Sequence, residues 1–206
     1  MTDPPVIPNS GSNPPTSATL LERARARDRG AWERLVDLYE PLILRWCRQA
    51  KLGRADAADI KQDVFLAVSG HIGAFRAEEA GHTFRGWLRT ITRNKIRDHL
   101  RREPPNYAET GGSDAYHELL NVEDAEPPDG SDAEVAEEVG VLYRRALELI
   151  VGDFEEVTWK AFWRVVVDGQ PPAGVAQDLE LSRNAVYLAK ARVLQRLRDE
   201  FKDLIR

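Results

Sequence analysis

Apolar residues recur at intervals of three or four along most of this chain, a spacing that places them on one side of an α-helix. The longest run extends from Trp32 to Trp46 and includes Leu35, Val36, Tyr39, Leu42 and Ile43. Pro41 lies inside this run, where it either kinks a helix or belongs to the first turn of the next one. No segment shows the strict alternation of apolar and polar residues that is typical of a half-buried strand. The pattern therefore predicts an all-α protein.

Turn-forming residues divide the helical pattern into segments. We expect further helices from near Leu20, over residues 55–71, 83–102, 133–151 and 154–167, and in two closely spaced segments after Gln170-Pro171-Pro172. Residues 1–17 have too little apolar surface to offset the entropy of ordering, which predicts a disordered tail. The turn-forming residues in 103–134 predict a flexible linker, with at most a short helix near 116–122. The expected architecture is two small helical domains, 18–102 and 135–206, joined by this linker.

Composition narrows the class of protein. Hydrophobic residues make up 42% of the chain and charged residues 31%, values typical of a soluble globular protein. No apolar run approaches the roughly 18 residues that cross a bilayer, and the first residues lack the basic and apolar segments of a signal peptide. We therefore expect a cytoplasmic protein without a membrane span. The single cysteine, Cys47, can form no internal disulfide, and its neighbours predict a buried structural thiol.

Charge is unevenly distributed along the chain, although the formal total is only −5. Residues 103–138 contain twelve Asp or Glu and no Lys or Arg. Outside this stretch, 29 basic residues stand against 22 acidic ones, a net charge of +7. The linker is thus acidic and joins two net basic segments, a segregation of charge that is compatible with nucleic-acid binding despite the negative total.

Residues 173–198 have the pattern of a helix-turn-helix. A short helix carries Val175 and Ala176 on its apolar side, and Ser182 is a suitable N-cap for a second helix that begins at Arg183. The inward positions of the second helix are Val186, Ala189, Val193 and Leu197. Its other side is polar and basic, as in a helix that contacts DNA.

The outward side of this second helix has the chemistry needed to recognise bases. Arg183 and Asn184 near its start are suited to guanine and adenine edges, and the cations that follow are suited to phosphates. An ordinary helical hairpin with a solvated basic face is the alternative. A left-handed backbone at Glu180, in the turn, would cost on the order of 1 kcal/mol.

The predicted helix over residues 83–102 carries seven cations and one acid. With Leu88, Ile91 and Leu100 turned inward, its exposed surface carries a stripe formed by Arg89, Arg93, Asn94, Arg97 and Arg101. Such a stripe favours phosphate binding, and a merely solvated basic helix is the alternative. Phe84 and Trp87 could stack on unpaired bases, but their spacing favours packing in the core.

Three segments together resemble the extracytoplasmic-function group of RNA polymerase sigma factors, in the sigma-70 family. They are DAADIKQDVFL at 56–66, FRGWLRTITRNKIRDHLRR at 84–102, and the helix-turn-helix that follows the acidic linker. The resemblance covers residues 20–102 and 135–200, in the family's order. It implies a protein that is not an enzyme, needs no metal or cofactor, and binds core RNA polymerase and promoter DNA to initiate transcription. Whether an inhibitory anti-sigma factor is a further partner stays open.

The resemblance also implies roles for individual residues. In the family, the helix with the Asp-x-x-Gln-Asp pattern docks on a coiled coil of the largest polymerase subunit, which here indicates Asp59, Gln62 and Asp63. The following loop, here residues 75–83, and the basic helix bind the opened −10 element, which indicates Arg89, Arg93, Asn94, Arg97 and Arg101. The helix-turn-helix binds the −35 duplex through its major groove, which indicates Arg183, Asn184, Tyr187, Lys190 and Arg192.

Three other classes of protein stay open at this point. A helix-turn-helix regulator that never joins polymerase would give the acidic pattern at 56–63 no role. A metal-dependent nuclease or hydrolase lacks the usual ligand-pair motifs and would have to use Asp56, Asp59, Asp63 and His71 or His99. A protein-interaction adaptor would leave both basic faces solvated and would show no salt-dependent affinity for DNA.

Overall fold

The computed structural model describes residues 19–75, 83–102 and 131–205, and the regular structure in these ranges is entirely helical. The all-α class is therefore confirmed. The predicted tail at 1–17, most of the loop at 75–83, and residues 103–130 of the predicted linker, with its short helix, lie outside the described residues. The end of the predicted linker, 131–134, is instead the cap and first turn of the helix Asp132–Ile150. Within the described residues, no helix is both long and apolar enough to span a membrane.

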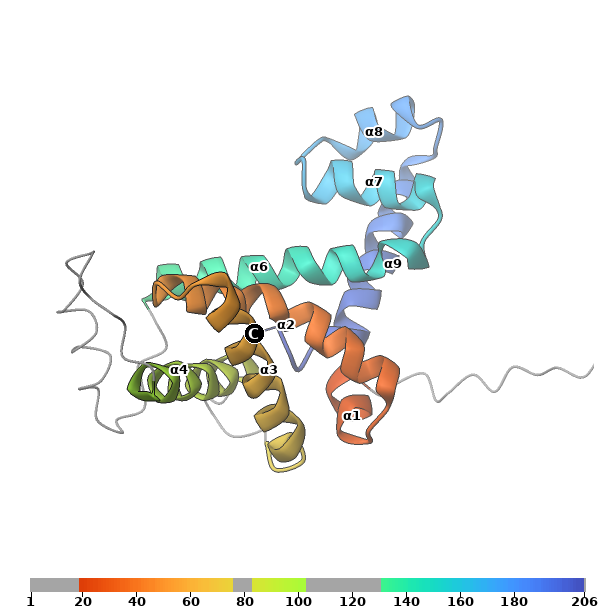
Figure 1. Ribbon diagram of the computed structural model, residues 1–206. Helices are drawn as coiled ribbons and strands as arrows, with labels where there is room; N and C mark the ends of the chain where they lie inside the picture. Colours follow the sequence, from red (N-terminus) through yellow and green to blue (C-terminus); the bar gives the residue numbers. More distant parts are fainter. Residues whose placement is uncertain (1–18, 76–82, 103–130, 206) are drawn as a thin grey trace, which may run out of the picture.

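The helices follow the predicted order (Figure 1). The N-terminal half contains α1 (Leu20–Arg25), α2 (Arg29–Gln49), α3 (Arg54–His71) and α4 (Phe84–Arg102). The C-terminal half contains α6 (Asp132–Ile150), the short 3-10 helix η1 (Val151–Asp153), α7 (Glu156–Val166), α8 (Pro172–Asp178) and α9 (Arg183–Phe201). Pro41 lies in the middle of α2, so the first of the two predicted alternatives, a proline within one helix, is correct.

Side-chain caps explain where several helices begin. The Thr19 hydroxyl accepts a hydrogen bond from the Glu22 backbone N–H, and the Glu22 carboxylate accepts one from the Thr19 N–H, forming a capping box before α1. Asp28 caps α2, Ser131 caps α6 and Ser182 caps α9. Each cap satisfies a backbone donor that the helix itself leaves unpaired. The cap at Ser182 is the one that the sequence predicted.

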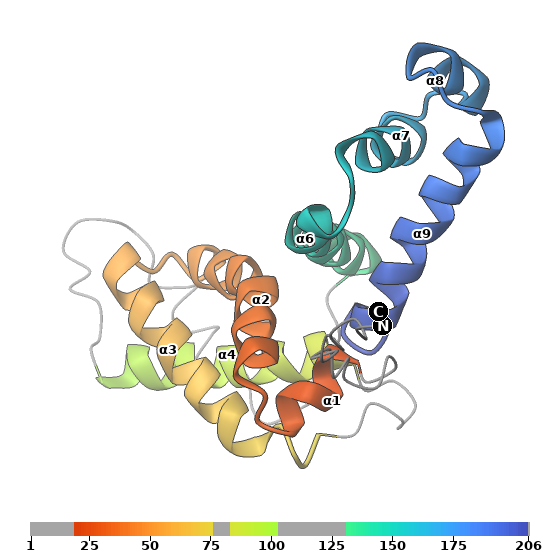
Figure 2. The ribbon, with the colours of Figure 1, turned by 90° about the vertical axis from the view of Figure 1, so that its right-hand side faces the viewer.

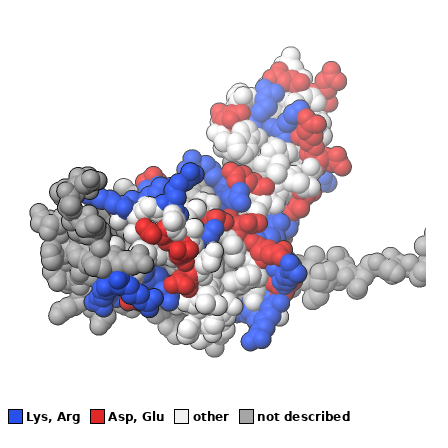
Figure 3. Space-filling model, viewed as in Figure 1, with Lys and Arg blue, Asp and Glu red and all other residues white. Residues whose placement is uncertain are grey.

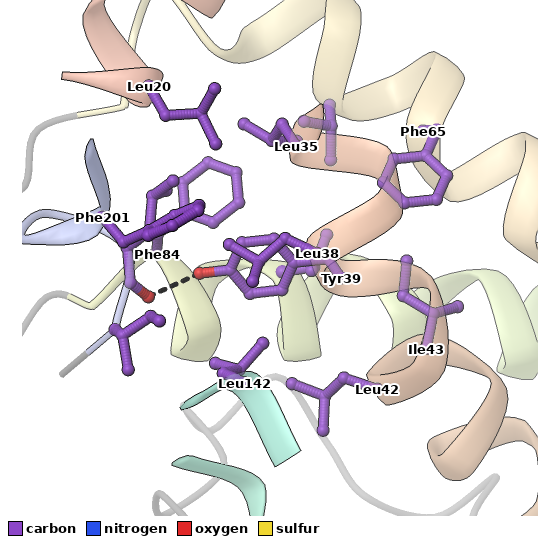
Figure 4. Close-up of a cluster of buried hydrophobic side chains, with 14 of the residues drawn as sticks. Leu20, Leu35, Leu38, Tyr39, Leu42, Ile43, Phe65, Phe84, Leu142 and Phe201 are labelled. Atoms are coloured by element: carbon purple, nitrogen blue, oxygen red, sulfur yellow. Dashed lines mark hydrogen bonds between the residues drawn. The ribbon is translucent and has the colours of Figure 1, made fainter. Parts of the chain in front are cut away.

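The core of the N-terminal half is built around α2. Leu35, Tyr39, Leu42 and Ile43 are completely buried, and α2 contacts α1, α3, α4 and α6 (Figure 4). Burying a large apolar side chain contributes about 1.5–3 kcal/mol, so α2 supplies a large share of the stability of this half. Cys47, also on α2, is a buried free thiol, as predicted, and burial raises its pKa to about 11.

A second, smaller core holds α7, α8 and the start of α9 together. Its buried side chains are Ala161, Val175, Ala176, Val186 and Ala189. The last four are inward positions that helical spacing predicted. Small side chains at these positions let α8 and α9 cross closely, and the turn at 179–182 connects them.

The two halves also share one continuous core. Leu142 and Ile150 on α6, and Leu197 and Phe201 on α9, belong to the same buried cluster as the α2 side chains. In a view turned by 90°, α9 runs as one long helix from α8 to the region of α1 (Figure 2). The described parts of the two predicted domains are therefore packed against each other, and the domain boundaries themselves stay a prediction.

Candidate nucleic-acid interface

The basic helix α4 concentrates positive charge on one part of the surface. Asn94 and Arg101 are exposed, Arg93 and Arg97 are half-buried, and Arg97 donates a 2.5 Å hydrogen bond to Asn94 Oδ1. Lys and Arg gather over α4 in the space-filling view (Figure 3). Burial and the charges of Arg89 and Arg97 lower the pKa of Arg93. Burial is the larger cause, and the two neighbouring guanidinium groups add to it because like charges lie close together there.

The structure departs from the predicted stripe at its first member, Arg89. The side chain of Arg89 is only 17% exposed, and its guanidinium lies 3.5 Å from Glu134 and 3.7 Å from Glu138, both on α6. The other four stripe residues lie further along α4, toward its C-terminal end. The predicted stripe is therefore divided: Arg89, at one end, is paired with acids of the C-terminal half, whereas the other four residues are exposed or half-buried.

Arg85 is a further cation of α4 whose position the sequence did not reveal. Its side chain is 1% exposed and donates a 2.6 Å hydrogen bond to Glu138 Oε2. Arg85 precedes Leu88 and Thr92, both buried, by three and seven positions. That spacing places it on the inward face of α4, and it could have identified Arg85 as buried.

The aromatic residues of α4 pack in the core, as their spacing predicted. Phe84 is 1% exposed and lies against Tyr39 and Phe75. Trp87 stacks on Phe75 with ring centroids 5.1 Å apart. These contacts hold the start of α4 against α2 and the segment that follows α3, so they orient the basic helix.

The acidic pattern of α3 forms an exposed face. Asp59, Gln62 and Asp63 are exposed, whereas Ile60 and Val64 on the opposite side are buried. Among the described residues, none of the three polar side chains makes a hydrogen bond or ion pair with another side chain. This face is therefore free to pair with a partner of complementary charge.

Leu66 extends this exposed face, and the sequence analysis missed it. It is 74% exposed, the highest value among the large hydrophobic side chains described. It follows Asp59, Gln62 and Asp63 by seven, four and three positions, so helical spacing alone assigns it to the same face. A single exposed leucine does not by itself mark an interaction site, but its position adds an apolar side chain to the acidic face.

The predicted recognition surface of α9 is exposed. The side chains of all five candidate residues lie in solvent and make no hydrogen bond or ion pair with another described residue; they are Arg183, Asn184, Tyr187, Lys190 and Arg192. The preceding turn has a left-handed backbone at Glu180, with φ of 54°. All five belong to the first ten residues of α9, the half of the helix that is nearer α8 and farther from α1 (Figure 2).

The residues proposed for a metal-dependent enzyme are not gathered into a site. His99 Nε2 lies 3.7 Å from Asp56 Oδ1, which links α4 to the start of α3. Elsewhere in the part of the chain that the structure describes, no three His, Cys, Asp or Glu side chains group closely enough to hold a metal ion. The contact between His99 and Asp56 therefore joins two helices and does not form a metal site.

Comparisons with known proteins agree on one family. The model of sigma-70 region 2 matches residues 35–104, which include α3, α4 and most of α2. The sigma factor SigD of Mycobacterium tuberculosis, described as an extracytoplasmic-function (ECF) RNA polymerase sigma factor, is 27% identical over 188 residues, covering 88% of this chain and 82% of SigD.

Two further relatives match over a little less than half of this chain. The ECF RNA polymerase sigma factor BldN of Streptomyces coelicolor is 34% identical over 94 residues, covering 46% of this chain and 35% of BldN. SigW of Bacillus subtilis, another ECF sigma factor, is 27% identical over 97 residues, covering 46% of this chain and 50% of SigW. The chain therefore spans about a third of the length of BldN and half of the length of SigW.

Among solved structures, the RsbN–BldN complex matches with a TM-score of 0.35 and 20% identity, covering 86% of this chain and 96% of that one.

Proposed function

Because this chain belongs to the extracytoplasmic-function group of sigma-70 factors, we propose that it binds core RNA polymerase and directs transcription initiation at particular promoters. The match to region 2 carries this proposal, since it covers both the acidic face of α3 and the basic helix α4. Synthesis of RNA then belongs to the polymerase, and this chain contributes promoter selection through binding, in the cytoplasm and without a metal or cofactor.

The acidic face of α3 is the proposed contact with core polymerase. Asp59, Gln62 and Asp63 are exposed and unpaired among the described residues, so a partner helix with arginines would find both charge and hydrogen-bond acceptors there. Leu66 adds an apolar contact on the same face. The rival class, a regulator that never joins polymerase, would leave this face without a partner.

The basic helix α4 is the proposed contact with the opened −10 element. Arg93, Asn94, Arg97 and Arg101 are exposed or half-buried on this helix, and the three arginines suit the phosphates of a single strand. Arg89 lies at one end of this surface, beside Glu134 and Glu138 on α6. Binding energy gained on the separated strand would favour strand opening over the intact duplex.

The helix α9 is the proposed contact with the −35 element. A helix of this kind enters the major groove with its N-terminal residues against the bases. Arg183 and Asn184 occupy that position, and Lys190 and Arg192 follow where phosphates would lie. Tyr187, 56% exposed, adds a hydroxyl and a ring on the same side.

The proposal is tested by transcription and by binding to polymerase. Run-off transcription of genomic fragments by core polymerase should give promoter-specific starts only when this chain is added. Asp63→Lys should lower retention of the chain on immobilised core polymerase, because it reverses a charge on the docking face. Asp168→Lys, an equal charge change at another exposed position, should not. A chain that core polymerase does not retain would contradict the proposal.

A further inference from the structure

Positive charge gathers at a third place in this molecule, besides α4 and α9. Residues 41–55 contain four cations and no Asp or Glu, and they form the end of α2 and the beginning of α3. The first of these cations, Arg45, is paired with Glu137 on α6. The other three are exposed, and we call them the α2–α3 corner: Arg48, Lys51 and Arg54. None of the contacts proposed above with polymerase or DNA uses these three side chains.

The cations of the α2–α3 corner have no partner within the described part of the chain, where they make no hydrogen bond or ion pair through their side chains. Other cations of the same half, such as Arg29 and Lys61, are paired with acids. The acid nearest to the corner in sequence, Asp56, contacts His99 on α4 instead. The charge of the corner is therefore not compensated locally, and it is available to an anion from outside the molecule.

The backbone holds the corner in one shape. At the end of α2, the Leu52 N–H donates a 3.1 Å hydrogen bond to the Cys47 oxygen, and the Lys51 N–H donates one of 2.9 Å to the Arg48 oxygen. This pair of bonds is the Schellman arrangement, in which glycine usually occupies the position of Lys51. Lys51 has a left-handed backbone, with φ of 58°. The lysine therefore lowers stability relative to glycine, and strained residues of this kind tend to lie at functional sites.

The corner lies beside the C-terminal end of α4. His99 Nε2 is 3.7 Å from Oδ1 of Asp56, which follows Arg54 by two positions, and α3 packs against α4. The last two residues of α4, Arg101 and Arg102, are exposed cations. Lys and Arg gather over the end of α2 as well as over α4 in the space-filling view (Figure 3). The corner therefore continues the basic surface beyond the end of α4.

The chemistry of the corner suits phosphates. Residues 48–54 contain no aromatic side chain on which an unpaired base could stack, although stacking is a usual part of single-strand binding. The backbone of a duplex, by contrast, is bound by cations alone. Because the −35 element is proposed to bind as a duplex and the −10 element as a single strand, duplex DNA must end near α4. The corner is placed to meet this last part of the duplex.

We propose that the α2–α3 corner is a further DNA contact, which binds the phosphates of the duplex adjoining the opened −10 element. This inference rests on the proposed function and adds a contact that neither α4 nor α9 supplies. The corner carries no group that reads a base edge, so it raises the affinity for every promoter alike. Promoter selection stays with α4 and α9, and the corner holds the duplex where it meets the separated strand.

Two DNA probes test the corner, with the full chain assembled on core polymerase. The first is a single strand that carries the −10 element of a promoter found by run-off transcription. The second is the same strand joined to about one helical turn, roughly ten base pairs, of the adjoining duplex. The corner variant combines three changes at exposed positions: Arg48→Gln, Lys51→Gln and Arg54→Gln. Affinity for each probe is measured at several salt concentrations.

The corner variant should bind the single strand like the unmodified chain and should bind the duplex-bearing probe more weakly. Each lost phosphate contact reduces the salt dependence of the affinity by about 0.9 in a double-logarithmic plot, so the slope should fall by about 2–3. The matched control removes the same total charge from exposed positions outside every proposed contact, through Arg27→Gln, Arg144→Gln and Arg198→Gln. It should match the unmodified chain on both probes.

Lys51→Gly separates DNA binding from stability. Glycine adopts the left-handed backbone of this position without strain, so the midpoint of thermal unfolding should rise. The same change removes one cation, so the affinity for the duplex-bearing probe should fall and its salt slope should decrease by about one. A residue with a purely structural role would show no loss of DNA binding when stability increases.

Three outcomes would overturn the inference. An unchanged salt slope of the corner variant on the duplex-bearing probe would exclude the contact. Equal losses on both probes would assign the corner to the single strand, and weaker retention on core polymerase would assign it to the enzyme.

Failure of the proposed function is recognised separately, because core polymerase would then not retain even the unmodified chain. In that case the corner variant and its control are compared on a plain duplex with the chain alone. A reduced salt slope in the corner variant supports the DNA contact, and an unchanged slope overturns it.

Discussion

Tyr39 Oη donates a 2.6 Å hydrogen bond to the backbone oxygen of Leu204, which joins the middle of α2 to the segment that follows α9 (Figure 4). Both residues are at most 1% exposed. Burial raises the pKa of Tyr39, so the phenol stays protonated and remains a donor at all ordinary pH values. The bond spans 165 positions of sequence and fixes α9 to the N-terminal half.

Tyr39→Phe should destabilise the protein by about 1–2 kcal/mol. The ring and its packing are kept, but the buried Leu204 oxygen loses its donor, and an unsatisfied buried acceptor costs about that much. Urea unfolding measures the change. Tyr143→Phe, at an exposed tyrosine, is the control and should leave the free energy of unfolding unchanged. A loss no larger than in this control would show that the Tyr39 bond is not maintained in solution.

Glu180→Gly should stabilise the protein by about 1 kcal/mol, because Glu180 has a left-handed backbone that costs a non-glycine residue about this much. Thermal or urea unfolding checks the change. Ala191→Gly, on the exposed side of α9, should instead cost about 1 kcal/mol, since glycine is unfavourable within a helix. Two variants that destabilise equally would contradict the left-handed turn.

Arg183→Ala and Lys190→Ala should weaken binding to the −35 duplex in different ways. Loss of a base contact at Arg183 should cost about 1–3 kcal/mol and relax specificity at one position. Loss of a phosphate contact at Lys190 should weaken binding to all sequences similarly and reduce the salt dependence by about one counterion. Titrations at several salt concentrations, with promoter and scrambled duplexes, distinguish the two. Identical behaviour of the variants would contradict these assignments.

Acid should weaken the contact between Glu137 and Arg45. Hydrogen bonds from Arg45 are the main reason that the pKa of Glu137 lies below its ordinary value of 4.5. A lowered folded-state pKa means that the ionised side chain stabilises the fold above the unfolded-state value, and that this stabilisation is lost as pH falls through the folded-state value. The unmodified chain should therefore be more stable than Glu137→Gln at neutral pH, and the difference should shrink below about pH 4.5.

Chemical unfolding of the unmodified chain and Glu137→Gln, at a series of pH values from about 7 to about 3, measures this difference directly. A difference that stays constant over the whole range would mean that the Glu137 carboxylate has no special stabilisation in the fold.

The helices and their inward faces could be predicted because helical periodicity is a local property. In α9, the spacing of Val186, Ala189 and Val193 was sufficient to identify the buried side. Ser182 could be identified as a cap for the same reason. Each of these predictions depends on residues within a few turns of one another, and long-range contacts do not alter them.

The contact between the halves could not be predicted in this way. Glu138 shares its helical face with Leu142, Ala146 and Ile150, four positions apart, and all four are buried. The spacing therefore indicates that Glu138 turns inward, but its partner Arg85 is 53 positions away. A charge of either sign on an apolar stripe implies a buried partner without identifying it.

The candidate site, like the fold, could be predicted only in part from the sequence. Exposure of Asp59, Gln62 and Asp63 followed from spacing, whereas Arg89 was expected on an open surface and is covered by α6. The difference has a simple cause. The side of a helix that faces away from its own domain is open only until another part of the chain packs there, and periodicity contains no information about that second packing.

The continuity of α9 has a mechanical consequence. Its 19 residues form a rod about 28 Å long, with the residues proposed to contact bases at one end and Phe201, buried in the shared core, at the other. A rod cannot pivot at its middle without breaking backbone hydrogen bonds. A displacement of the exposed end of α9 is therefore carried along the helix to Phe201, which lies in the core that the two halves share.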